Sequence, residues 1–473
     1  MKRRQFLSAA GAGTAASLLP AGPAHAASIA SVGGLSGTSL LPARMADLVP
    51  QNYLVNTKMF YATQVYQHTD AITDLLAELG GRGIRERITT GTSLGTRAQL
   101  YAMPRLANRG VKWHATVGNL EDWQNATAVN REAVDFLATR YAPMMGGDLT
   151  KLMHSFGGCN EIDGPGRDGL RDPEWASHAR TMQRALWEQA KGNPVTRGVR
   201  VAGPSTRTDF TRERAAQLGD LSAWCELGNG HLYNKGRSPT AEIDEHLDIL
   251  SPCFPGIRDY IMTETGYNNS PQDNLGRTIP EWASAIYAIR GICDYLRRDT
   301  VYGRFELLDD PDPIDYTSQQ TINRTAVRDA HFGLIAMTKQ TVNESTPDTW
   351  RKKAEFYATS RLLNLLADVG PIFSPEPLEL TVSGPTADVQ HLLVQKRDGR
   401  HYLVLWRDVD VCEWYPSGRE IVIAPIELTV EMRQARPIAV YAPNRKAEPL
   451  RTAPASNIFK IKLRGDLQVV EIG

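Results

Sequence analysis

The sequence has few cysteines, and its charges balance. The cysteines show neither CxxC nor Cys/His metal spacing, which argues against a zinc site, and we expect no metal and no cofactor. Lys and Arg together number 53, as do Asp and Glu, so no overall field favours nucleic acid or an anionic membrane surface as a partner. A neutral ligand is favoured instead. The cysteines are Cys159, Cys225, Cys253, Cys293 and Cys412.

Long hydrophobic runs are also absent. No stretch of about 18 apolar residues occurs, so we expect no membrane insertion of the mature chain. The N-terminus has a basic start with the pair Arg3-Arg4, then a mildly apolar stretch, then the small-x-small pattern AHA ending at Ala26. This arrangement resembles a twin-arginine export signal. It predicts a signal peptide over 1–26, a linker over 27–49, and a protein secreted or held in the periplasm or cell envelope.

The chain also lacks a Gly-x-Gly-x-x-Gly turn after its first predicted strand, which weakens the case for a doubly wound nucleotide-binding sheet. Short apolar segments instead alternate with amphipathic stretches of helical length, eight times over about 320 residues. This α/β alternation predicts a (β/α)8 TIM barrel over 50–370. Alternating strands then predict a small antiparallel all-β sandwich over 371–473. The predicted barrel strands begin near Tyr53, Ile84, Val111, Leu152, Val199, Gly230, Tyr260 and Tyr302.

An acidic residue ends a strand that is predicted to be buried. Glu264, in the stretch MTETGYNN, comes just after the apolar run YIM. A buried carboxylate there destabilises the fold unless it is ion-paired or has a functional role. Barrel enzymes hold their functional groups at the carboxyl ends of the strands. A second acid, Glu161, follows the fourth predicted strand in HSFGGCNEIDG. Three βα units separate strands four and seven, which matches the separation of about 100 residues, so the two carboxylates could face one another across the barrel mouth.

These two positions resemble those of the retaining glycoside hydrolases of clan A. In that group the acid/base is a Glu preceded by Asn at the end of strand four, and the nucleophile is a Glu at the end of strand seven. Asn160-Glu161 and Thr263-Glu264 fall on those positions. The resemblance covers residues 50–370 and implies hydrolysis of O-glycosidic bonds in a poly- or oligosaccharide by double displacement. The mechanism needs two carboxyl groups about 5–5.5 Å apart, with pKa values pushed apart.

The same resemblance implies roles for further residues. Arg85 in GIRERI would orient the nucleophile, although Arg87 competes with it because alternate strand residues point to one face. His231 and Tyr233 in GHLYN match a His-x-Tyr pair whose tyrosine hydrogen-bonds the nucleophile. Asn160 would contact the sugar 2-hydroxyl.

The chain departs from this pattern after strand eight, where many clan members have a tryptophan. The stretch RFELLDD places Glu306 and Asp309 there instead. Glu306 then becomes a candidate substrate-binding residue, and an acidic floor would favour a basic or metal-bridged ligand. His114 and His154 are expected to be structural and buried. Candidate platforms for stacking on a sugar are Trp123, Trp175 and Trp224.

Two other classes of protein use the same residues. One is a metal-dependent barrel enzyme with Glu161, His231, Glu264 and Asp309 as ligands, since oxygen-rich sites suit Mg²⁺ or Mn²⁺. The other is a non-catalytic carbohydrate-binding barrel, against which the presence of both glutamates argues. The choice depends on the geometry of the site, because fold alone does not fix function.

Overall fold

The computed structural model describes residues 37–473, except 63–64, 167–169, 271–277, 310–330, 340–343 and 415–416. The predicted signal peptide and part of the predicted linker lie outside the described residues. Among the described helices, none is both long and apolar enough to cross a bilayer.

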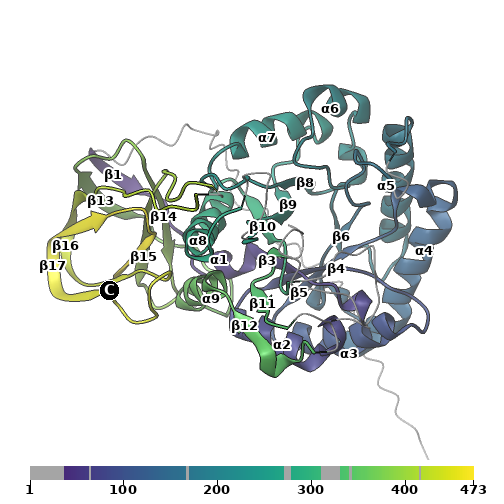
Figure 1. Cartoon of the computed structure of the whole chain (residues 1–473), viewed down its shortest axis with the longest axis horizontal. Helices are drawn as coiled ribbons and strands as arrows, with labels where there is room; N and C mark the ends of the chain where they lie inside the picture. The colour runs from purple at the N-terminus through teal and green to yellow at the C-terminus, as the bar shows by residue number, and fades with distance from the viewer. Residues whose placement is uncertain are drawn as a thin grey trace, which may run out of the picture. The chain divides into compact units, whose positions relative to one another are not determined.

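The larger part of the described chain is a curled parallel sheet surrounded by helices (Figure 1). The described strands of this sheet run in the order β7-β6-β5-β4-β3-β10-β9-β8. Its two ends meet at one parallel bridge between Ala202 and Leu227, because β7 is only two residues long. This arrangement is consistent with the predicted barrel, but the two ends of the sheet are joined by a single β-bridge and not by a full ladder of hydrogen bonds. The strands are β3 Tyr53–Asn56, β4 Gly83–Arg87, β5 Lys112–Thr116, β6 Met153–Gly157, β7 Arg200–Val201, β8 Gly228–Leu232, β9 Tyr260–Thr265 and β10 Thr300–Arg304.

Amphipathic helices cover the outer face of this sheet. In α2, the buried residues Ile72, Leu76 and Leu79 recur at helical spacing, and Gly80 ends the helix in a left-handed conformation with φ 83°. The main helices are α2 Thr69–Leu79, α3 Leu94–Asn108, α4 Ala126–Phe136, α5 Trp175–Gly192, α6 Arg212–Leu218, α7 Ile243–Leu250, α8 Glu281–Arg297 and α9 Ala354–Leu366.

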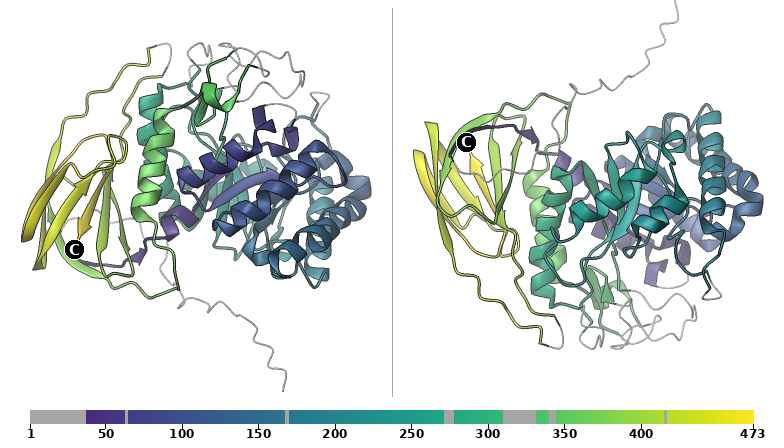
Figure 2. Two further views of the ribbon diagram at one scale, coloured as in Figure 1. Left: turned by 90° about the horizontal axis from the view of Figure 1, so that it is seen from below. Right: turned by 90° about the horizontal axis from the view of Figure 1, so that it is seen from above.

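A second, mostly antiparallel sheet is formed mainly by residues after the barrel, with the order β1-β13-β16-β18-β15-β14-β2 and with β17 paired to β16. One apolar core holds residues from strands far apart in this order, such as Leu41 and Leu393. The sheet therefore curls over a core of its own, and Figure 2 shows the curl of its strands. Residues 37–45, which fall in the predicted linker, form two of its strands. The strands are β1 Gly37–Leu41, β2 Arg44–Met45, β13 Leu378–Ser383, β14 Val389–Gln395, β15 His401–Arg407, β16 Ile426–Tyr441, β17 Arg451–Leu463 and β18 Gln468–Ile472.

The barrel helices α8 and α9 lie against this second sheet (Figures 1 and 2). Leu403 and Leu405 of β15 face the core of the sheet, whereas Val404 and Trp406 pack with the barrel core. Both faces of β15 are thus covered, and this explains its unbroken run of buried residues. The buried Arg290 of α8 donates to the carbonyls of Val409 and Gly465 and ties the two parts together.

Candidate active site

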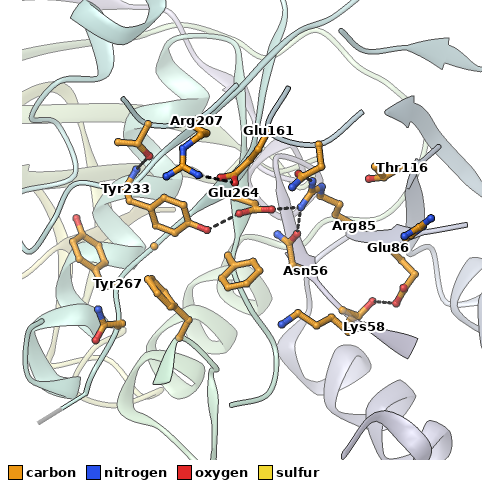
Figure 3. A pocket seen from close by; sticks show the side chains of 18 of the residues that line it. Asn56, Lys58, Arg85, Glu86, Thr116, Glu161, Arg207, Tyr233, Glu264 and Tyr267 are labelled. Atoms are coloured by element: carbon orange, nitrogen blue, oxygen red, sulfur yellow. Dashed lines mark hydrogen bonds and ion pairs between the residues drawn. The ribbon is translucent and has the colours of Figure 1, made fainter. Parts of the chain in front are cut away.

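A pocket of about 830 Å³ opens at the carboxyl ends of the barrel strands. Side chains that follow different strands line it, and Figure 3 shows the central ones. The predicted residues Arg85, Asn160, Glu161, Tyr233 and Glu264 all line this pocket. The structure therefore brings together residues that lie far apart in the sequence.

Glu264 is the most enclosed carboxylate of this group, with 8% of the residue exposed. Its Oε1 accepts a hydrogen bond from Arg85 Nη1 at 2.5 Å, and its Oε2 accepts one from the Tyr233 hydroxyl at 2.7 Å (Figure 3). His231 Nδ1 lies 3.4 Å from Oε2. Burial alone would raise the pKa of Glu264, but the charges of His231 and Arg85 and the hydrogen bonds from Tyr233 and Arg85 outweigh it and lower that pKa. The side chain is held as an anion, which suits a nucleophile.

A local irregularity of β9 aims this carboxylate. The register of β9 shifts by one residue against β8 between Gly230 and His231, and against β10 between Tyr302 and Arg304. β9 therefore carries one extra residue relative to both neighbours, which is the geometry of a bulge. The shift places His231 beside Glu264 in the ladder. Bulges of this kind recur beside active sites because they redirect a side chain.

Glu161 lies beyond the end of β6 in a left-handed backbone conformation, φ 44°. Few residues other than glycine adopt this conformation without a compensating role. The Glu161 amide donates to Ser205 Oγ at 3.2 Å. Its carboxylate lies 3.2 Å from His231 Nδ1 and 3.5 Å from Arg207 Nη1, with 33% of the side chain exposed. This acid is therefore more accessible than Glu264.

The two acids and one histidine form a compact cluster. One oxygen of Glu161, one oxygen of Glu264 and one ring nitrogen of His231 lie within 4.8 Å of one another. Three ligand atoms at this spacing could hold a cation. Asp309, the fourth ligand in the alternative hypothesis of a metal-dependent enzyme, is ion-paired with Lys353 at 2.8 Å and does not belong to the cluster found among the described residues.

Arg85 and Arg87 have different surroundings, although both line the pocket. Arg85 Nη1 also donates to Asn56 Oδ1 at 2.7 Å, and its Nη2 donates to Asn160 Oδ1. Asn160 therefore helps to orient Arg85, and Ser205 Oγ donates to the same oxygen at 3.2 Å. Of the two arginines, Arg85 is the one bound to Glu264.

Glu306 is buried and does not line the pocket among the described residues. Its carboxylate is paired with Lys58 Nζ at 2.9 Å. The preceding residue, Phe305, lines the wall instead, together with Phe332. The acidic side chain that was expected at the base of the pocket is thus buried in an ion pair behind Phe305 and Phe332. The sequence did not distinguish these positions because the inward face at the end of a strand depends on its register.

The other aromatic and histidine candidates lie outside the pocket lining given by the described residues. Trp123 stacks on His178, with ring centroids 3.8 Å apart. Trp175 is buried, and Trp224 packs against the core. His114 and His154 are hydrogen-bonded through Ser155, and burial lowers the pKa of both, which supports the expected structural role.

Three residues beside the catalytic candidates were not predicted from the sequence. Asn56 ends β3 with a polar side chain after a buried run, the same signal that singled out Glu264. Arg207 comes from the loop after β7 and belongs to no motif, whereas Tyr267 lies after β9 in the stretch MTETGYNN, three residues after Glu264, and was not singled out there. Only their packing around the pocket identifies them.

The five cysteines are buried, and their thiols are free. The sequence left open whether any of them pair.

We expect Tyr233→Phe to move the acidic limb of the pH profile of kcat/KM to higher pH. The Tyr233 hydrogen bond lowers the pKa of Glu264, so its loss raises that pKa, and Glu264 protonates, becoming inactive, at a higher pH. The activity lost near neutral pH should be about tenfold. Tyr267→Phe is the control, because its hydroxyl donates to the Arg237 carbonyl; an equal shift in both variants would contradict the assignment.

No family model and no curated protein matches this sequence. Solved structures match at low identity. A glucosidase from Croceicoccus marinus has a TM-score of 0.55 and 11% identity, covering 85% of this chain and 91% of that one. A monomeric beta-xylosidase from Caulobacter crescentus CB15 has a TM-score of 0.55 and 15% identity, covering 92% and 97%. A beta-porphyranase of glycoside hydrolase family 86 from Bacteroides plebeius has a TM-score of 0.52 and 13% identity, covering 92% and 76%. At these identities the likeness shows the fold, which this chain shares with glycoside hydrolases.

Proposed function

We propose that the protein is an exported, retaining glycoside hydrolase with Glu264 as nucleophile and Glu161 as acid/base. The observation that carries the proposal is the approach of the two carboxylates, whose nearest oxygens lie within 4.8 Å. Retaining enzymes hold their two carboxyl groups about 5–5.5 Å apart, whereas inverting enzymes leave about 6.5–9.5 Å for a water molecule. The shared fold is compatible with this activity, and the site supports it.

In the first step, a Glu264 oxygen bonds to the anomeric carbon while the bond from that carbon to the leaving oxygen breaks. Glu161, in its protonated form, gives its proton to the leaving oxygen. Arg85 and Tyr233 hold Glu264 ionised and fix its orientation. Their hydrogen bonds leave the carboxylate in place for in-line attack.

In the second step, Glu161 takes a proton from water, the water oxygen bonds to the anomeric carbon, and the bond to Glu264 breaks. The half-exposed position of Glu161 gives water access to it. We propose that Asn160, held by Arg85 and Ser205, presents its amide to the sugar 2-hydroxyl.

The proposal is tested by incubating the purified protein with aryl glycosides and cell-wall polysaccharides and following the anomeric configuration of the first product by NMR. Product that keeps the configuration of the substrate supports the proposal. Product of the opposite configuration would contradict it. Recovery of the mature protein from the cell envelope or medium checks the export.

A metal-dependent enzyme is the second candidate, and the Glu161, His231 and Glu264 cluster is the observation that favours it. The surroundings of Glu264 weigh against it. Arg85 donates a hydrogen bond to one of its oxygens and Tyr233 donates one to the other. A cation at this position would lie close to the positive guanidinium of Arg85, and the carboxylate oxygens that should bind it are already engaged in these hydrogen bonds.

We therefore expect EDTA treatment followed by desalting to leave hydrolysis unchanged, because protein donors already neutralise Glu264. The measurement is the initial rate on the best substrate of the panel, with and without chelator. A loss of activity that Zn²⁺, Mn²⁺ or Mg²⁺ restores would replace the glycosidase mechanism by the metal-dependent one.

A further inference from the structure

The basic side chains of the pocket wall are only partly neutralised. Arg85 is paired with Glu264, Lys58 with Glu306, and Arg207 with Glu161 and Asp209. In the described part of the chain, Arg87 and Lys235 have no ion pair. Each is half-buried, and removing a charge from water without a partner has an energetic cost.

The acidic side chains that line the described part of the pocket are already paired or hydrogen-bonded. Asp209 is held by Arg207 and by Arg214, at 3.2 and 3.6 Å. Glu86 accepts hydrogen bonds from Thr57 Oγ1 and the Met59 amide, each at 2.7 Å, within the wall. Burial raises the pKa of Glu86 to about 8, which disfavours its charged form at neutral pH. Among the described residues, the unmatched charges that face the cavity are positive.

Lys235 is held in place by its loop. Its backbone is left-handed, φ 53°, and the next residue, Gly236, has φ 84°. The loop is fastened on the far side, where the Ser238 amide donates to Asp410 Oδ1 at 2.7 Å. A non-glycine residue kept in this conformation by its surroundings is a feature that clusters at ligand sites.

Arg87 and Lys235 lie on opposite sides of the pocket mouth. Arg87 ends β4, and Lys235 follows β8, strands four places apart around a curled sheet of eight described strands. Arg87 points to the same face as Arg85 but one step of about 7 Å further out along β4. The cluster of Glu161 and Glu264 lies over strands β6 and β9 of the same mouth.

We propose that the substrate is an acidic glycan, and that Arg87 and Lys235 each bind an anionic group on sugars at the two sides of the pocket. The anionic group is a carboxylate of a uronic acid or a sulfate ester, since both present oxygens that accept charge-assisted hydrogen bonds. This inference rests on the proposed glycosidase function. It replaces the neutral ligand that the balanced overall charge favoured, because local charges decide what a pocket binds.

The test measures binding by calorimetry in the Glu264→Gln variant, which leaves the glycan intact. Four ligands form two matched pairs, namely a uronic acid oligosaccharide with its carboxyl-reduced form and a sulfated oligosaccharide with its desulfated form. We expect the acidic member of one pair to bind at least about tenfold more tightly than its neutral partner, with affinity falling as salt rises. The pair that shows the preference identifies the anionic group.

Arg87→Gln and Lys235→Gln, made in the same background, should each weaken acidic binding by about tenfold and flatten its salt dependence. Arg87→Lys and Lys235→Arg, which keep the charge, should restore part of the affinity. Arg184→Gln is the matched control, because Arg184 lies exposed on α5 and pairs only with Glu188 among the described residues.

Equal binding of acidic and neutral partners, or equal affinity in all three Gln variants, would overturn the inference. Retaining hydrolysis of neutral and acidic glycans at the same kcat/KM by the wild type would also overturn it while leaving the proposed function intact. Selective binding of acidic glycans that the wild type never cleaves would support the anion sites and reject the hydrolase.

Discussion

Replacing Glu264 by Gln is expected to lower kcat by at least about 10⁴-fold on every glycoside that the wild type cleaves. The amide removes the negative charge that must attack the anomeric carbon, and no covalent intermediate can form. The pKa of Glu264 is already lowered by its neighbours, so the wild-type group is an anion at neutral pH and the substitution removes that anion outright.

The fold should survive this change. Gln is nearly isosteric with Glu, and its carbonyl can still accept from Arg85. Arg85 also keeps Asn56 and Asn160 as acceptors, so it is not left as an unpaired buried charge. Circular dichroism and thermal unfolding of the variant check this directly.

Glu188→Gln is the matched control, since Glu188 lies on the exposed face of α5 and pairs only with Arg184 in the described structure. Its kcat should equal that of the wild type. Full activity in a folded Glu264→Gln protein would move the nucleophile to another carboxylate or favour the metal-dependent enzyme.

Replacing Glu161 by Gly is expected to affect substrates in proportion to how much acid assistance they need. On natural glycosides, whose leaving oxygen must be protonated, kcat should fall by about 10²–10⁴-fold. On dinitrophenyl glycosides the glycosyl-enzyme should still form quickly and then persist, because the base for the second step is missing. A burst of dinitrophenol followed by a slow steady rate is the measurable result.

Glycine suits this position for a backbone reason. Glu161 is in the left-handed region, which glycine adopts freely and alanine adopts at a cost of about 1–2 kcal/mol. Arg207 keeps Asp209 as a partner at 3.2 Å, so the variant leaves it paired. The fold and the pocket should therefore be unchanged.

Azide should rescue the Glu161→Gly variant and give a glycosyl azide of retained configuration, because the anion fits the space of the lost carboxylate. In a Glu264→Gly variant an added anion should attack from the nucleophile's face and give the inverted product. If azide gave inverted product in the Glu161 variant, the roles of the two acids would have to be exchanged.

The positions of the strands show how much of the fold can be predicted from the sequence. The predicted barrel strands starting at Tyr53 and Tyr260 match β3 and β9 at their first residues, because both faces of a barrel strand are covered and its apolar run is continuous. Nothing in the order of residues indicates that β7 spans only two residues, since its shortness follows from how the ends of the sheet meet.

Alternation along a strand could not separate Arg85 from Arg87, because both point to the same face. Tertiary structure decides between them, since only Arg85 meets Glu264 and Asn160. The same holds after strand eight, where Phe305 lines the wall and Glu306 is buried against Lys58. Arg207 was missed because nothing in its neighbours along the chain marks it, and Tyr267 was missed because its closeness to Glu264 in the sequence does not show that its side chain lines the pocket.

The sequence by itself determined the eight-fold βα alternation, the β-rich C-terminal part, and the two glutamates that follow strands four and seven. These features can be predicted because the spacing of apolar residues along the chain reflects strand and helix periodicity and burial. The tertiary structure alone decided the approach of the two carboxylates, the lowered pKa of Glu264 and the unmatched charges of Arg87 and Lys235. Electrostatic energies depend on distance and burial in space, and separation along the chain encodes neither.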